Sequence, residues 1–172
     1  YMDMDEGLRR RLKIERDVEV RGHALEEVEA ALDSRIEDTE RFIKPQIMHA
    51  DIVFHIEPAR ASQLTDGTPI KKIRLQLRIS LRRSLYHEHM IRLLIGDCGV
   101  HVEHDLDEQT SSIELLVDSD VSAEDLSRVA KRLIPQSEEL LDVEPIWQPG
   151  ITGVMQLVVL AQAAQILRER ND

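Results

Sequence analysis

Several features that mark common protein classes are scarce in this chain of 172 residues. It has one cysteine, Cys98, which excludes an internal disulfide and is typical of a reducing compartment, so we expect a cytoplasmic protein. Aromatic residues make up only 3% of the sequence, too few for the stacking surfaces that bind single-stranded nucleic acid. The net charge of −11 lacks the basic excess of nucleic-acid or anionic-membrane binders. We therefore expect neither as a partner.

Long apolar runs are also scarce. The longest block, residues 154–167, has 11 apolar residues and three glutamines, which we interpret as too short and too polar to cross a bilayer. We expect a buried or interface helix there. The first ten residues, YMDMDEGLRR, show no signal peptide. Because the chain begins with Tyr1 rather than methionine, we expect it to be part of a longer protein.

The first third of the sequence predicts helices and one short strand. An acidic first turn followed by an apolar stripe predicts a helix over residues 5–21. A second helix, in two pieces, is predicted over residues 24–43 and is expected to end at Pro45. Residues 50–58, ADIVFHIEP, predict a strand.

The composition then changes. Residues 59–69, ARASQLTDGTP, are typical of a linker. Residues 73–81, IRLQLRISL, alternate apolar and polar side chains, which predicts a half-buried antiparallel strand. Residues 91–95 and 100–106 flank GDCG and predict two strands joined by a hairpin turn.

The remaining sequence predicts one more strand and two helices. SSIELLVDS, residues 111–119, predicts the strand, and Ser122 with Asp125 forms a capping-box pattern at the start of a helix. The last helix is expected to follow the segment 150–153. We predict a domain boundary at the linker, with residues 1–58 before it and residues 70–172 forming a dimerisation domain after it.

Six basic residues lie between positions 9 and 21. In a helix, Arg9, Lys13 and Arg16 fall on one face, where they would converge on a phosphate group. Asp17 would orient the Arg16 guanidinium or approach a metal. The pattern also fits a solvated helix with ordinary ion pairs between neighbouring turns, and by itself it does not decide between the two.

The first 57 residues resemble the phosphoribulokinase and uridine kinase family. The resemblance depends on the order and spacing of D-x-D-x-x-x-R-R (3–10), KIERD (13–17), RGH (21–23) and FIKPQ followed by ADIV (42–53). Uridine kinases usually have RGR and PTK where this chain has RGH and PQ, so it looks closer to phosphoribulokinase. The later half agrees more loosely, at residues 73–79 and at TGVMQ (152–156).

The resemblance implies roles for individual residues. Lys13 and Arg16 match lid residues that contact phosphates during transfer, and Asp17 matches their acidic partner. Arg21 matches a ligand of the sugar phosphate. His23 stands where uridine kinases have arginine, and it either contacts a substrate hydroxyl or fills a structural position.

The resemblance also implies a fold and cofactors. We expect an α+β chain: helices and a short strand from the end of a P-loop α/β kinase core, then a mostly antiparallel sheet with covering helices. The intact parent would use ATP, with Arg9 near its phosphates, and Mg²⁺. None of the seven glycines fits G-x-x-x-x-G-K-[ST], so we expect the phosphate cradle upstream of Tyr1 and neither cofactor in this fragment.

Three functions follow as hypotheses. The first is the C-terminal half of a sugar-phosphate kinase that transfers the ATP γ-phosphoryl group to ribulose 5-phosphate, and the second is a uridine kinase-like nucleoside kinase. The third is a non-catalytic dimerisation or regulatory module. In each we expect a homodimer. We expect no metal at the four histidines between residues 87 and 104, and an ordinary turn role for Cys98.

Overall fold

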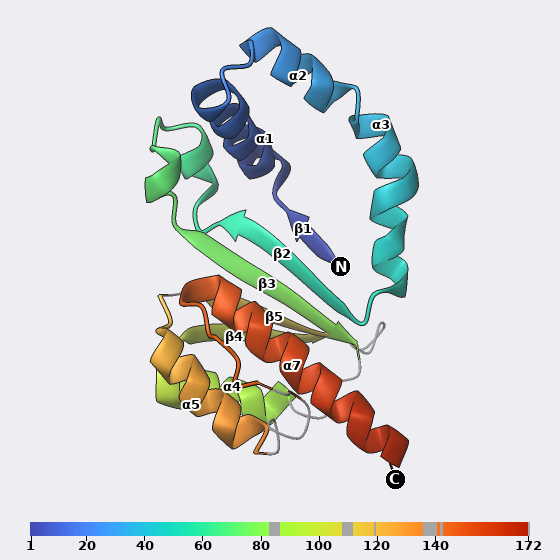
Figure 1. The fold of residues 1–172 in the computed structure, drawn as a ribbon, viewed down its shortest axis with the longest axis vertical. Coiled ribbons are helices and arrows are strands. Elements are labelled where there is room, and N and C mark those ends of the chain that lie inside the picture. Colours follow the sequence, from blue (N-terminus) through green and yellow to red (C-terminus); the bar gives the residue numbers. More distant parts are fainter. Residues whose placement is uncertain (83–86, 108–111, 119, 136–140, 142, 172) are drawn as a thin grey trace. The chain divides into compact units, whose positions relative to one another are not determined.

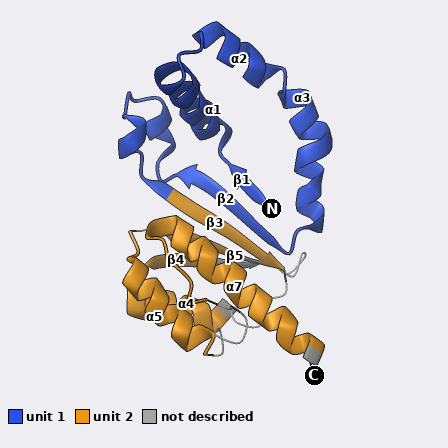
Figure 2. Ribbon diagram, viewed as in Figure 1, with its two compact units in different colours: residues 1–75 blue, residues 76–172 orange. Residues whose placement is uncertain are grey.

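The computed structural model describes residues 1–82, 87–107, 112–118, 120–135, 141 and 143–171. These residues form two compact units, 1–75 and 76–172 (Figures 1 and 2). The chain is of mixed α and β class, with a parallel strand pair in the first unit and antiparallel strands in the second.

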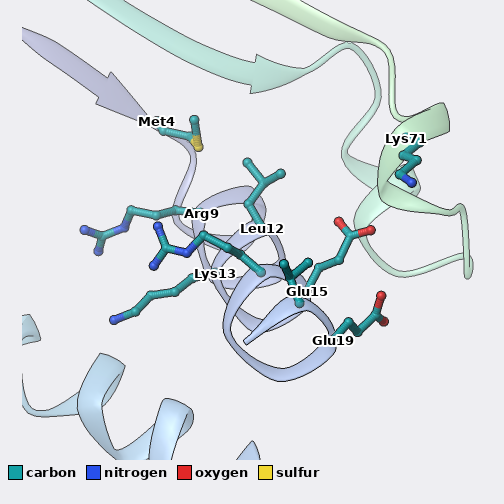
Figure 3. A pocket seen from close by; sticks show the side chains of 9 residues that line it. Met4, Arg9, Leu12, Lys13, Glu15, Glu19 and Lys71 are labelled. Carbon is teal, nitrogen blue, oxygen red and sulfur yellow. The ribbon is translucent and has the colours of Figure 1, made fainter. Parts of the chain in front are cut away.

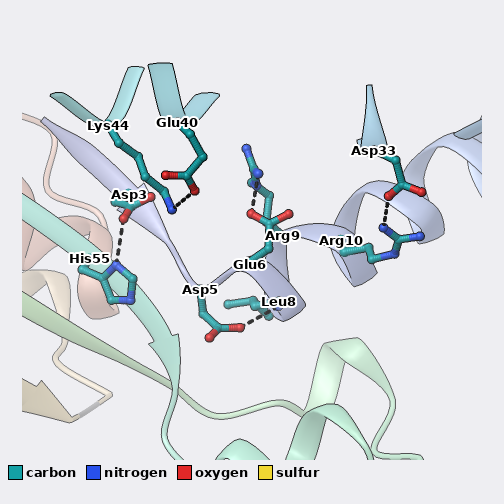
Figure 4. Close-up of polar contacts among 10 residues, drawn as sticks. All are labelled: Asp3, Asp5, Glu6, Leu8, Arg9, Arg10, Asp33, Glu40, Lys44 and His55. Carbon is teal, nitrogen blue, oxygen red and sulfur yellow. Dashed lines mark hydrogen bonds and ion pairs between the residues drawn. The ribbon is translucent and has the colours of Figure 1, made fainter. Parts of the chain in front are cut away.

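The first unit begins with the basic helix. α1 (Glu6–Ile14) continues without a break into a π-helical segment, η1 (Glu15–Val20), which confirms the helix predicted there. The Asp5 side chain caps it by accepting a hydrogen bond from the Leu8 backbone nitrogen at 2.9 Å (Figure 4). Gly22 has a φ of +74°, a left-handed conformation that favours glycine and ends the helix.

The first unit also contains a parallel pair of strands. β2 (Ile52–Pro58) is the strand predicted from ADIVFHIEP, and it pairs with β1 (Met2–Met4), with Asp3 opposite His55. The Asp5 backbone nitrogen donates to the Ile56 oxygen at 2.8 Å and extends the pairing. Sequence analysis missed β1, because three residues are too few to show alternation.

A run of helical segments connects α1 to β2 (Figure 1). It consists of α2 (Leu25–Asp33), α3 (Ile36–Asp38), the π-helical η2 (Thr39–Ile43) and the 3₁₀ helix η3 (Lys44–His49). The predicted helix is confirmed, in more than the two pieces expected, and so is its end near Ile43, where η2 stops. A separate 3₁₀ helix then begins, with Pro45 at an early position, where its missing N–H needs no partner.

The segment predicted as a linker is packed within the first unit. It contains the 3₁₀ helix η4 (Ala61–Leu64) and is followed by a second, η5 (Ile70–Lys72). The Arg11 guanidinium donates to the backbone oxygens of Gln63 at 2.8 Å and Thr68 at 2.7 Å, which ties the segment to α1. The segment is thus held against the first compact unit, which extends to Leu75.

The second unit contains three antiparallel strands. β5 (Ser112–Asp118) pairs on one side with β3 (Leu75–Arg82) and on the other with β4 (His101–Asp107). The alternation predicted for β3 is confirmed, since Leu77, Ile79 and Leu81 are buried while the side chains between them are partly exposed. The antiparallel prediction for this strand is confirmed as well.

One predicted strand is a helix. Residues 91–95 lie in α4 (His87–Cys98), so the hairpin around GDCG is wrong. The buried residues Met90, Ile91, Leu93 and Leu94 have the spacing of one helical face, which a five-residue apolar run conceals. Gly99, with a φ of +63°, follows the helix end. The antiparallel pair is instead β4 with β5, and residues 108–111 between them lie outside the described residues.

Cys98 is the last residue of α4 rather than a hairpin turn residue. Burial, together with the nearby carboxylates of Asp125 and Asp97, raises the pKa of its thiol to about 11. An exposed cysteine has a pKa of about 8.5, so at pH 8 the reactive thiolate of Cys98 is roughly a hundredfold less abundant.

We therefore expect Cys98 to react with iodoacetamide at pH 8 roughly a hundredfold more slowly in the folded protein than in the urea-unfolded chain. Mass spectrometry of timed samples measures both rates. The folded-state rate should rise steeply between pH 9 and 11. Equal rates in the folded and unfolded protein at pH 8 would contradict the assignment.

Two further helices are described in the second unit. α5 (Ala123–Leu133) begins at Ser122, whose side chain accepts a hydrogen bond from the Asp125 backbone nitrogen at 3.1 Å, as the capping pattern predicts. α7 (Gly150–Asn171) begins at Gly150, so the expected loop at 150–153 is already helical. One face of α7 is buried through Val154, Leu157, Val158, Ala161 and Ala164.

α7 is longer than its apolar block suggests. In the described part of the chain it alone, over Gly150–Arg170, is long and apolar enough to cross a membrane, with a mean hydropathy of 1.6. The expectation that this segment is too short and too polar is therefore wrong by length and composition. One such helix is weak support for a membrane span, because the core helix of a soluble protein meets the same criteria.

The TGVMQ motif fixes the entry to α7. The Gln156 side chain accepts a hydrogen bond from the Gln148 backbone nitrogen at 2.8 Å and donates to the Ile146 oxygen at 3.2 Å. Gly153 is buried, and a methyl group added there would overlap both the Gln148 backbone oxygen and the Leu126 side chain on α5. The glycine and the glutamine together hold the preceding segment against the helix.

Candidate functional site

A cavity of about 690 Å³ lies beside the basic helix, within the first unit (Figure 3). It is formed by the end of β1, by one face of α1 and η1, and by η5. The cavity is large enough for a small organic ligand. Its lining residues are Met4, Arg9, Leu12, Lys13, Glu15, Arg16, Glu19, Val20 and Lys71.

Three predicted phosphate-binding residues share this cavity. Arg9, Lys13 and Arg16 recur at intervals of four and three residues, which places them on one face of a continuous helix. Figure 3 shows Arg9 and Lys13 projecting toward the same side of α1. The grouping inferred from spacing is thus present, and it produces one cationic side of the cavity.

The Arg16 guanidinium is held in place by Asp17. Its Nε donates to Asp17 Oδ1 at 2.8 Å and its Nη2 donates to Oδ2 at 3.1 Å, a two-point contact between planar groups. Asp17 is buried, with 7% of its surface exposed. The Arg16 hydrogen bond is the largest cause that holds the pKa of Asp17 below its usual range, so the carboxylate stays ionised well into acidic pH.

Arg21 and His23 do not line the cavity. Arg21 donates through Nη1 to Asp17 Oδ1 at 3.1 Å, so one carboxylate holds two guanidinium groups. The His23 side chain is exposed, and its backbone nitrogen donates to the backbone oxygen of Asp17 at 2.9 Å. The structure therefore brings Arg21 to the site through Asp17 and leaves His23 outside the cavity.

Other basic residues of this helix are structural. Arg10 donates to Asp33 at 2.8 Å (Figure 4). It also donates to Glu29 at 3.1 Å, and the two contacts link α1 to α2. Arg11 is occupied by backbone oxygens of the following segment. Arg10 and Arg11 therefore fit the interpretation of ordinary structural contacts, whereas Arg9, Lys13 and Arg16 line the cavity. The position of each residue on the helix decides which groups its side chain meets.

Arg9 and Lys13 retain binding capacity. The Arg9 guanidinium pairs with Glu6, but its Nε is buried without a hydrogen-bond partner among the described residues. Lys13 forms no hydrogen bond or ion pair with any residue in the described ranges. The Lys13 ammonium and the Arg9 guanidinium lie on one wall of the cavity, where they are suited to bind an anionic group such as a phosphate.

Sequence reasoning missed three charged lining residues. Glu15 and Glu19 follow the basic residues on the same helix, and Lys71 comes from η5, more than 50 positions away. Both glutamates lie in the helix predicted from the sequence, four residues apart. Helical spacing alone could therefore have placed them on one face. Nothing in the sequence placed Lys71 near them, since it follows the presumed linker.

The prediction that no metal binds at the four histidines concerns residues 87–104, which do not line the cavity. In the described part of the chain, no three histidine, cysteine, aspartate or glutamate side chains gather closely enough to hold a metal ion. His101 is exposed and pairs with Glu103 at 3.2 Å. The side chains of His87 and His104 lie outside what the structure describes.

Comparison with known proteins relates this helix and cavity to one family. Residues 1–62 match the model of the phosphoribulokinase / uridine kinase family. The match includes α1, η1 and β2, and it contains every cavity residue except Lys71.

Individual phosphoribulokinases are also similar to part of this chain. The phosphoribulokinase of Synechocystis sp. is 34% identical over 77 residues, which are 45% of this chain and 22% of the relative. The chloroplastic phosphoribulokinase of Spinacia oleracea is 33% identical over 75 residues, 44% of this chain and 19% of the relative. The chloroplastic phosphoribulokinase of Arabidopsis thaliana is 34% identical over 77 residues, again 45% and 19%. The aligned part is about a fifth of the length of these relatives.

Proposed function

Because residues 1–62 match the model of the phosphoribulokinase and uridine kinase family, we propose that the chain is part of a sugar-phosphate kinase. The reaction would transfer the γ-phosphoryl group of ATP to a hydroxyl of ribulose 5-phosphate. The acceptor follows from the relatives, whose names are phosphoribulokinase. The three cationic side chains on one wall of the cavity are the observation that carries the proposal.

The geometry suits phosphoryl transfer for a physical reason. The transition state is loose and spreads negative charge over the oxygens of the transferred group, so the protein mainly positions groups and stabilises charge. Arg16, fixed by Asp17, presents a guanidinium that needs little reordering to bind two oxygens. Lys13 supplies a compact positive charge beside it. Arg21 shares the Asp17 carboxylate and is assigned to the phosphate of the acceptor.

The residues present fit one part of MgATP. Arg9, Lys13 and Arg16 would hold phosphate oxygens, and the bound nucleotide would supply the transferable phosphoryl group. The described residues include no cluster of oxygen ligands for Mg²⁺, and the 172 residues contain no glycine-rich phosphate cradle. These parts of the site are assigned to residues outside this sequence.

The assay that tests this proposal compares two proteins. The first is the 172-residue chain, and the second is a longer protein that also carries the sequence G-x-x-x-x-G-K-[ST]. The longer protein should phosphorylate ribulose 5-phosphate with ATP, whereas the 172-residue chain alone should show no turnover. Preference for uridine would favour the nucleoside-kinase alternative. No turnover with any acceptor would favour a non-catalytic module.

We also propose that the protein is a homodimer through the second unit. α7 carries exposed apolar side chains away from its buried face, at Val159, Ile166 and Leu167. Val159 and Ile166 are seven residues apart, two helical turns, so they form a stripe on one side. A second copy of this chain would cover that stripe with its own, as a two-fold axis requires.

We expect sedimentation of the 172-residue chain at micromolar concentration to give a dimer, twice the monomer mass of 19.8 kDa. Changing both Val159 and Ile166 to glutamate should produce monomers with unchanged circular dichroism. Val143→Glu is the matched control, since Val143 is an exposed apolar residue of the same unit outside α7. A monomeric wild-type chain, or a dimer insensitive to the double change, would exclude this interface.

A further inference from the structure

One wall of the cavity comes from a loop of the first unit, residues 59–74. Eight of the nine lining residues lie at positions 4–20, and the ninth, Lys71, belongs to η5 in this loop. Figure 3 shows Lys71 on the side of the cavity toward which Glu15 and Glu19 point. The Lys71 side chain makes no hydrogen bond or ion pair with the residues that the structure describes, so its position depends on the backbone that carries it.

Few contacts within the loop fix this backbone. Its base is closed by a hydrogen bond from the Ala59 nitrogen to the Arg74 oxygen at 2.8 Å. No residue at positions 60–72 is buried, although the Leu64 side chain lies close to Gly7 of α1. Apolar packing therefore contributes little to holding the loop, and its polar contacts with α1 decide where it lies.

The Arg11 side chain supplies polar contacts of this kind. Its Nη1 donates to the backbone oxygens of Gln63 at 2.8 Å and Leu64 at 3.2 Å, and its Nη2 donates to that of Thr68 at 2.7 Å. The guanidinium is charged and the contacts are partly buried, so they are stronger than hydrogen bonds between neutral surface groups. They hold the loop on both sides of Gly67, where a φ of +78° turns the backbone.

The held loop changes the charge of the cavity. Arg11 and Glu15 are four residues apart on a continuous helix, so the loop bound by Arg11 borders the wall that carries Glu15. The lining contains four cationic and two anionic side chains. The positive charge of Lys71, on the side of Glu15 and Glu19, offsets their repulsion of an anion bound in the cavity.

We propose that Arg11 is a positioning residue for anion binding, which holds the loop on α1 and thereby keeps the charge of Lys71 at the cavity. Arg11 does not line the cavity, so it acts through the loop and not by touching the ligand. The inference rests on the proposed function, because it takes the cavity as the site of the ATP phosphates.

Lysine at position 11 separates this role from the charge of Arg11 itself. Arg11→Lys keeps the positive charge, but an ammonium on a flexible stem cannot replace a planar guanidinium that serves three oxygens. If Arg11 contributed only its charge, the variant would bind anions like the wild type. A positioning role predicts weaker binding.

The experiment measures the dissociation constant of inorganic tripolyphosphate for the 172-residue chain by NMR titration at low salt. Arg11→Lys and Lys71→Met should each raise it by roughly three- to tenfold, the scale for displacing one charge near a multiply charged ligand. The variant with both changes should bind no more weakly than either single variant, since Arg11 acts through Lys71. Arg10→Lys is the matched control, because Arg10 pairs with α2, and it should leave the constant unchanged.

Two further measurements report on the loop directly. The backbone ¹⁵N heteronuclear NOE of residues 62–72 should fall in Arg11→Lys and stay unchanged in Arg10→Lys, because the loop moves once its contacts are lost. Gly67→Val strains the loop without altering α1, since its φ is positive. It should weaken tripolyphosphate as Arg11→Lys does, and it tests the role if circular dichroism shows that Arg11→Lys fails to fold.

The outcomes separate this inference from the proposed function. Wild-type affinity in Arg11→Lys or in Lys71→Met, or fully additive effects of the two, would show that Arg11 does not act through Lys71. Weaker binding by Lys13→Met would then still support phosphate recognition at the cationic side. If the wild-type chain does not bind tripolyphosphate, or if Lys13→Met binds it equally well, the cavity is not a phosphate site, and the proposed function falls together with this inference.

Discussion

Replacing Arg16 with alanine should lower kcat by roughly 10²–10⁴ in a protein that combines this chain with a nucleotide-binding half, the scale for losing a positioned contact to a developing charge. Arg16 lines the cavity, and its guanidinium is already oriented by two hydrogen bonds from Nε and Nη2 to Asp17. Steady-state assay with ATP and ribulose 5-phosphate measures kcat and KM separately.

Two variants give this experiment its controls. Arg60→Ala removes an exposed arginine of the same unit that does not line the cavity, and it should leave kcat unchanged. Arg21→Ala should mainly raise KM for the sugar phosphate, since Arg21 is assigned to substrate binding. Near-normal kcat in Arg16→Ala, or equal losses in Arg16→Ala and Arg60→Ala, would remove Arg16 from the reaction.

A second large effect is expected at Gly153. Alanine there would drive its methyl group into the Gln148 backbone oxygen and the Leu126 side chain, and neither can move without disturbing the packing of α5 on α7. Overpacking of this kind costs about 1–3 kcal/mol of unfolding free energy. For a unit of this size, each kcal/mol corresponds to about 4–8 °C in Tm. Thermal unfolding followed by the fluorescence of Trp147, beside the affected backbone, measures the loss.

Gly96→Ala is the matched control for that substitution. Gly96 lies in α4 of the same unit, its φ is not positive, and an added methyl group there meets no atom within 4 Å. Alanine is favoured over glycine inside a helix by about 0.5–1 kcal/mol, so this change should raise Tm slightly. Similar Tm values for the two variants would show that the close approach at Gly153 does not affect the free energy of unfolding.

Helical spacing and short-range patterns were sufficient for much of the chain. The face shared by Arg9, Lys13 and Arg16, the cap at Ser122 and the alternation of β3 each depend on residues within one or two turns or one strand. Such contacts are set by the periodicity of the backbone, which the sequence displays directly. The resemblance of the first 62 residues to the phosphoribulokinase and uridine kinase family was also evident from local motifs, because the residues concerned are close together in the chain.

Longer-range features required the folded chain. Sequence reasoning assigned residues 91–95 to a strand, because a short apolar run fits either a strand or a helix until its buried side is known. It treated residues 59–69 as a linker, although Arg11 binds their backbone oxygens. Composition alone does not reveal such a partner when it lies some fifty residues away.

The candidate site shows the same division. Its cationic side follows from a single helix, so the amino-acid sequence determined it. The tertiary structure decided how the cations are used: Arg10 pairs with α2, Arg16 is fixed by a buried Asp17, and Lys13 makes no hydrogen bond or ion pair with the residues that the structure describes. It also placed Lys71 in the same cavity as Glu15. The segments that line a cavity are those that pack together, and packing depends on the whole arrangement of side chains rather than on position along the chain.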